Sequence, residues 1–120
     1  MWGSGAPLRQ FIFARDLARL TLLALRAYDS AEPLILSVDA AEEVPIREVA
    51  QLIAQATGLE ERALAWDASK ADGQFRKTAS NAKLRALLAR VRPDFAFTSI
   101  REGIRETVDW FAANYETARK

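Results

Sequence analysis

The residues best suited to bind an anion lie near the start of the sequence. Arg9 follows a glycine-rich stretch that contains Gly3 and Gly5, and Trp2 lies at the other end of that stretch. An Arg guanidinium can donate two parallel hydrogen bonds to a phosphate, and glycines let the backbone approach a ligand closely. The stretch lacks the glycine spacing and the following helix of a P-loop or dinucleotide-binding motif. Two interpretations stand: a phosphate ligand at Arg9, or a surface Arg beside a flexible end.

A second charged cluster lies in the middle of the chain. Lys70, Arg76 and Lys77 surround a turn signal at Asp72 and Gly73. Cations can neutralise a diphosphate while a carboxylate accepts hydrogen bonds from sugar hydroxyls, so this mixture of charges suits a phosphorylated sugar. Charged turns are also common on protein surfaces, and a solvated turn is therefore the competing interpretation.

The composition excludes much of common enzyme chemistry. The chain has no Cys and no His, which removes thiol nucleophiles, disulfides, imidazole catalysis and zinc sites of the usual ligand types. Neither Tyr28 nor Tyr115 is followed four residues later by the Lys of a reductase pair. Asp39, Glu42 and Glu43 lack the spacing of a calcium loop, so we interpret them as helix-start charges rather than a metal site.

Length and charge indicate one domain that covers residues 1–120. Seventeen basic and sixteen acidic side chains give a net charge of +1, which is too balanced for a general nucleic-acid binder. The apolar stretch Leu17–Tyr28 is too short to span a membrane, and Arg19 and Arg26 interrupt it. Met1–Pro7 does not resemble a secretory signal. We expect a cytoplasmic protein that binds neither nucleic acid nor membrane.

Periodicity predicts about four helices joined by short strands. Apolar spacing predicts helices over Leu17–Asp29, between Pro45 and Gly58, from about 80 to Leu88, and from about 98 to Thr117. Runs rich in apolar and aromatic residues predict strands over Arg9–Ala14, Leu34–Val38 and Ala63–Trp66.

Capping residues mark the expected helix ends. Asp16 is expected to cap the first helix, and Gly58 to end the second. Ser80 or Asn81 precedes the third helix, and Thr98 or Ser99 the last. The first helix is apolar on most of its circumference, which predicts packing partners on both flanks.

Several segments resemble the GDP-L-fucose synthases, a family of extended short-chain dehydrogenases. The resemblance covers nearly the whole chain, and its most specific parts are the Asp-Gly-Gln-Phe-Arg-Lys loop and the C-terminal end. The matching segments are Trp2–Ile12, Asp16–Ala18, Ile35–Val38, Asp67–Ser80, Trp110–Phe111, Asn114–Glu116 and Ala118–Lys120.

The resemblance implies a small α/β fold, the C-terminal substrate-binding portion of such an enzyme without its Rossmann core. Members of the family are homodimeric, NADP-dependent enzymes that epimerise GDP-4-keto-6-deoxy-D-mannose at two carbons and reduce its ketone to give GDP-L-fucose. Their cofactor loop and their catalytic Ser, Tyr, Lys, Cys and His belong to a preceding domain that this sequence lacks. We therefore expect a truncated chain that alone binds no NADP(H) and performs no catalysis.

The resemblance also implies roles for both charged clusters. In the family, the equivalents of Trp2, Arg9 and Asp72 contact the GDP-sugar, and that of Lys77 approaches its diphosphate. Arg9 and Lys77 would neutralise charge, Asp72 would recognise a hydroxyl or the base, and Trp2 would pack its indole or donate its N–H. No catalytic, cofactor-binding or metal-binding residue is expected.

Two other functions compete with GDP-sugar binding. The first is a protein-interaction module that associates with a full-length subunit or with itself through the exposed apolar helix. The second is a truncated product without any function of its own.

Overall fold

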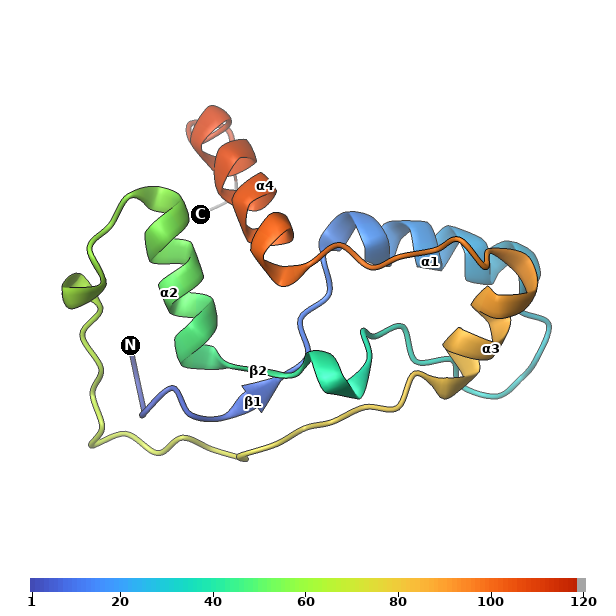
Figure 1. Cartoon of the computed structure of the whole chain (residues 1–120), viewed down its shortest axis with the longest axis horizontal. Helices are drawn as coiled ribbons and strands as arrows, with labels where there is room; N and C mark the ends of the chain where they lie inside the picture. Colours follow the sequence, from blue (N-terminus) through green and yellow to red (C-terminus); the bar gives the residue numbers. More distant parts are fainter. Residues whose placement is uncertain (119–120) are drawn as a thin grey trace.

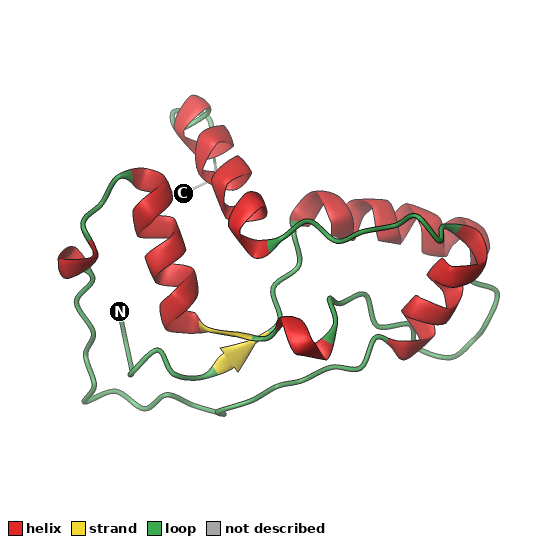
Figure 2. Cartoon of the chain, in the orientation of Figure 1, coloured by secondary structure: helices red, strands yellow, loops and turns green. Residues whose placement is uncertain are grey.

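The computed structural model describes residues 1–118 as four helices and two short strands joined by long loops (Figures 1 and 2). The molecule measures 48 × 34 × 24 Å, and its radius of gyration of 16.7 Å exceeds the about 14 Å of a compact chain of this length. In chain order the elements are β1 (Leu8–Arg9), α1 (Ala14–Ala27), a 3-10 turn (Ala40–Glu42), β2 (Val44–Pro45), α2 (Ile46–Thr57), a second 3-10 turn (Glu61–Ala63), α3 (Ala82–Val91) and α4 (Ile100–Ala113).

An apolar core lies at one end of the long axis. We call this end the apolar lobe, formed by α1, residues 34–38 and α3 (Figure 1). Leu20 and Leu84 are fully buried there. Phe95 and Phe97 pack against this core, with their rings edge to face at a centroid distance of 5.3 Å. Each fully buried leucine contributes about 2 kcal/mol through removal of apolar surface from water.

Helices α2 and α4 pack against each other at the other end (Figure 1). The predicted bounds of α2 are confirmed, since the helix starts after Pro45 and ends at Gly58 in the left-handed conformation. Of the two caps proposed for α4, Ser99 is the one used, and its hydroxyl accepts a hydrogen bond from the Glu102 N–H at 3.3 Å. The helix ends at Ala113 rather than near Thr117.

The predicted strands are largely wrong. The first contracts to Leu8–Arg9, and neither Leu34–Val38 nor Ala63–Trp66 forms a strand. Leu34, Leu36 and Val38 are nevertheless more buried than Ile35, as on one face of a strand. Within residues 1–118, no neighbouring strand pairs with this segment, and the carbonyls of Ser37 and Val38 accept hydrogen bonds from side chains instead. A segment of strand-forming composition becomes a β-strand only when the backbone N–H and C=O groups of a neighbouring strand pair with its own.

The prediction of Asp16 as an N-cap is also wrong. Phe13 holds that position in extended conformation, so Asp16 falls inside the first turn of α1. The buried Asp16 carboxylate accepts a hydrogen bond from the Thr98 N–H at 2.7 Å, which ties α1 to the segment before α4.

Helix α1 is covered on one flank only. Leu20 is fully buried, but Leu22 is 56% and Leu25 is 80% exposed, so the second predicted partner is not among the described residues. None of the described helices is long and apolar enough to cross a membrane.

Candidate functional site

Segments distant in sequence meet at β1. Antiparallel pairing with β2 joins Leu8 to Pro45 and Arg9 to Val44. On its other edge, Leu8 forms a parallel bridge with Arg76, and its N–H donates to the Phe75 carbonyl at 2.8 Å. We call residues 1–9, 43–47 and 65–78 the junction, and Figure 1 shows its three runs converging on β1 and β2. The two predicted anion-binding segments therefore lie side by side.

Asp72 connects its loop to the glycine-rich segment. Its carboxylate accepts hydrogen bonds from the Ser4 N–H at 2.5 Å and the Ser4 hydroxyl at 2.6 Å. Gly3 has a φ of +81°, and a Cβ there would lie 2.4 Å from Asp72 Oδ1, so this approach requires glycine. The hydrogen bonds from Ser4 lower the pKa of Asp72 below its usual value, and the bond from the Ser4 hydroxyl has a larger effect than the bond from the Ser4 N–H. Asp72 is thus an ionised acceptor at neutral pH.

The Arg9 guanidinium is directed onto main-chain carbonyls. Its Nη1 donates to Leu8 O at 2.6 Å and Phe75 O at 3.3 Å, and its Nη2 donates to Gln74 O at 2.8 Å. An Arg side chain has five N–H groups in all, so Nε–H and one Nη2 hydrogen are left for a further acceptor. Arg9 both holds the 74–78 segment and retains donors for an anion.

Of the predicted site residues, Trp2, Asp72 and Lys77 are exposed and Arg9 is half-buried. Trp2 is 82% exposed, while its backbone forms a bridge with Asp67. Lys77 is exposed, and its ammonium has no polar partner among the described residues. Arg9 and Asp72 therefore help to build the junction, whereas Trp2 and Lys77 extend from it.

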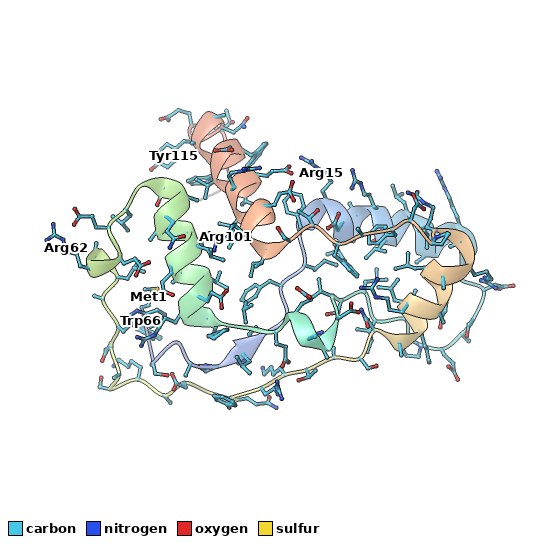
Figure 3. The ribbon with its side chains drawn as sticks, in the orientation of Figure 1. Met1, Arg15, Arg62, Trp66, Arg101 and Tyr115 are labelled. Carbon is cyan, nitrogen blue, oxygen red and sulfur yellow. The ribbon has the colours of Figure 1, made fainter. Side chains whose placement is uncertain are left out.

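Sequence reasoning missed three polar residues of the junction. Arg47 donates from Nε to the Ser4 carbonyl at 3.1 Å, and its guanidinium lies 5.1 Å from the centre of the Trp66 ring. Figure 3 shows Trp66 beside the start of α2. Ser4 holds Asp72, and Glu43 accepts from Arg76 at 2.6 Å. These partners are too distant in sequence for a local pattern to reveal them.

The acidic segment before β2 binds guanidinium groups. Asp39 pairs with Arg85 and accepts from Asn81 Nδ2 at 2.8 Å. The hydrogen bond from Arg85, and to a smaller extent that from Asn81, lowers the pKa of Asp39 to about 2. Glu43 pairs with Arg76, so Arg76 of the predicted cation cluster faces a carboxylate of the protein. Asp39 and Glu43 thus act in ion pairs rather than as helix-start charges.

An apolar cavity of about 570 Å³ lies between α2, α4 and the segment before α1. Its lining includes Phe11, Phe13, Ile53, Ile104 and Phe111, none of which belongs to the predicted anion site. The cavity offers apolar surface for packing rather than groups for binding a phosphate.

Comparison with known proteins identifies relatives over the whole chain. The model of the NAD dependent epimerase/dehydratase family matches residues 1–38. A probable GDP-L-fucose synthase of Drosophila melanogaster is 52% identical over the entire chain, which covers 36% of that protein. The GDP-L-fucose synthase of Dictyostelium discoideum is 49% identical over 98% of the chain, which covers 35% of that protein.

A solved structure agrees with these relatives. The GDP-L-fucose synthetase of Naegleria fowleri bound to NADP matches with a TM-score of 0.87 and 45% identity, covering all of this chain and 36% of that one. The chain thus spans about a third of the length of its relatives, which fits the predicted C-terminal portion. The predicted fold class, a partial short-chain dehydrogenase domain of four helices with short strands, is confirmed.

The described residues do not fit a dinucleotide cofactor. The sheet formed within residues 1–118 has two antiparallel strands, and the glycine-rich segment leads into β1 rather than into a helix N-terminus. A dinucleotide site needs that helix N-terminus to hold the pyrophosphate.

Proposed function

We propose that this chain is the GDP-sugar-binding portion of a GDP-L-fucose synthase, since it matches about a third of the length of such enzymes at 49–52% identity. Conversion of GDP-4-keto-6-deoxy-D-mannose to GDP-L-fucose with NADP(H) is then an activity of a full-length enzyme. Alone, this chain would bind the nucleotide-sugar weakly through Trp2, Arg9, Asp72 and Lys77, and would bind no NADP(H).

The parallel bridge between Leu8 and Arg76 is the observation that carries this proposal. If the parallel pairing of Leu8 with Arg76 continues by one residue along both segments, Arg9 lies beside Lys77. Because successive side chains of extended chain point to opposite faces, Arg9 and Lys77 then share the face opposite Leu8 and Arg76. Two cations on one face can neutralise one diphosphate, and the free N–H groups of Arg9 supply directed hydrogen bonds.

Asp72 and Trp2 supply recognition beside these cations. Asp72 is ionised and fixed by Ser4, and its remaining lone pairs can accept from a sugar hydroxyl or the base. The exposed indole of Trp2 offers a face for stacking and an N–H donor. Both residues lie in the junction, because Trp2 pairs with Asp67, and Asp67 precedes Asp72 in the same segment, residues 65–78.

Calorimetric titration with GDP tests the proposal on the chain as it exists. We expect Lys77→Met to weaken GDP binding about tenfold, because a charge-assisted contact to phosphate is lost. Lys83→Met is the matched control, since it removes the same charge from α3, outside the junction, and it should leave the affinity within about twofold. Equal losses for both variants would indicate unspecific attraction, and absent GDP binding to the wild-type chain would reject the proposal.

A second candidate function is association with a full-length subunit or with another copy of this chain. The exposed Leu22 and Leu25 on α1 favour it, since clustered apolar side chains on a helix invite packing. Light scattering after size exclusion separates the two functions. A monomer that binds GDP supports the first, and an oligomer indifferent to GDP supports the second.

A further inference from the structure

Glu43 is a buried carboxylate that holds two side chains of the 74–78 segment. Its side chain is only 2% exposed. One carboxylate oxygen accepts from Arg76 Nε at 2.6 Å, and the other accepts from the Thr78 hydroxyl at 2.5 Å. Glu43 thereby joins the residue before β2 to a segment more than thirty positions away in sequence.

These two contacts determine which way Lys77 faces. Arg76 and Thr78 both reach Glu43, so Lys77 between them points to the opposite face of the extended segment. The sheet register agrees, because Arg9 pairs with Val44, the residue next to Glu43. Arg9 and Lys77 therefore share one face, and Glu43 and Arg76 share the other.

The backbone alone holds the segment weakly. The 74–78 segment meets β1 through one bridge and one main-chain hydrogen bond, from Leu8 N–H to the Phe75 carbonyl. A slip of one residue along such a contact turns every side chain to the other face. Arg9 holds the carbonyls of Gln74 and Phe75, but these contacts do not select the face of the side chains.

We propose that Glu43 is a positioning residue that fixes the register of the 74–78 segment and so presents Lys77 beside Arg9. This inference rests on the proposed binding of a GDP-sugar diphosphate. Glu43 itself lies on the opposite face and makes no contact with the ligand. The two Glu43 carboxylate oxygens accept hydrogen bonds from Arg76 and Thr78, which are two residues apart. Both bonds form together only when the 74–78 segment keeps its present alignment with β1.

The GDP affinity of three variants tests this role. We expect Glu43→Gln to weaken GDP binding about tenfold, since a misplaced cation loses most of its directed contact. Thr78→Val is neutral and nearly isosteric, so it should act in the same direction with a smaller effect. Glu42→Gln is the matched control. Removing a negative charge favours binding of an anion, so an effect of charge alone would tighten GDP binding in both Glu variants.

Hydrogen exchange at the Leu8 amide provides a readout independent of the ligand. This N–H donates to Phe75 O, so loss of register should speed its exchange about tenfold in Glu43→Gln and leave it unchanged in Glu42→Gln. If the wild-type chain fails to bind GDP, the proposed function fails, while faster Leu8 exchange still supports the register role. Unchanged Leu8 exchange in Glu43→Gln and Thr78→Val, or unchanged GDP affinity in both, overturns the inference.

Discussion

The apolar lobe and the junction are stabilised by different interactions. Leu20, Leu84 and Leu88 pack together in the apolar lobe with almost no exposed surface. Apart from the buried Glu43 carboxylate, the junction is linked by hydrogen bonds of exposed or half-buried groups, such as those between Ser4 and Asp72. Buried apolar area dominates folding stability, whereas exposed polar contacts add little to it. The apolar lobe thus sets the stability of the chain, and the junction keeps polar groups available to a ligand.

The largest effect should come from the centre of the apolar lobe. Leu20 is fully buried, so Leu20→Ala should lower the free energy of unfolding by about 3 kcal/mol through lost burial and a residual cavity. Urea denaturation followed by circular dichroism measures this change.

Leu25→Ala on the same helix provides the control. Leu25 is 80% exposed, so its truncation should change the free energy of unfolding by less than about 0.5 kcal/mol. Similar losses for both variants would contradict the comparison, because they would show that the exposed flank of α1 is covered in solution.

A smaller effect is expected from the ion pair between Asp39 and Arg85, at the edge of the apolar lobe. Hydrogen bonds from Arg85 and Asn81 lower the pKa of Asp39 from 3.8 to about 2 in the folded state. Its contribution to stability is therefore present above about pH 4 and is lost as the pH falls towards 2. Since the Asp39 side chain is 39% exposed, solvent screening limits this contribution to about 1 kcal/mol.

Comparison of the wild type with Asp39→Asn tests this pH dependence. The difference in free energy of unfolding should be largest near neutral pH, should shrink below about pH 4, and should be mostly lost at pH 2, where about half of the folded-state Asp39 carboxylate is protonated. A difference that is constant between pH 7 and pH 2 would rule out the ion pair as its cause.

Helix ends were predictable where the signal is local. Gly58 ends α2 as expected, and Ser99, one of the two expected caps, caps α4, because each residue acts on backbone groups within a few positions. Asp16 shows the limit of such signals. Its carboxylate could cap a helix, but it is buried and accepts a hydrogen bond from the N–H of Thr98, which is far away in sequence.

Long-range pairing was the main source of error. Leu34–Val38 has the composition of a strand, yet no described segment pairs with it. Similarly, nothing near Glu43 indicates that Arg76 and Thr78 are its partners. The two predicted anion-binding clusters came from residue types and from the family resemblance, and the structure brings their segments together at Leu8 and Arg76. The contacts that orient the side chains within them required the folded chain.

Amide hydrogen exchange with and without GDP tests most directly whether Arg9 and Lys77 hold one diphosphate. We predict that GDP slows exchange in residues 3–9 and 72–78 together, and that GMP, which lacks the second phosphate, does so less. Protection of only one of these segments, or protection confined to another part of the chain, would contradict a shared site.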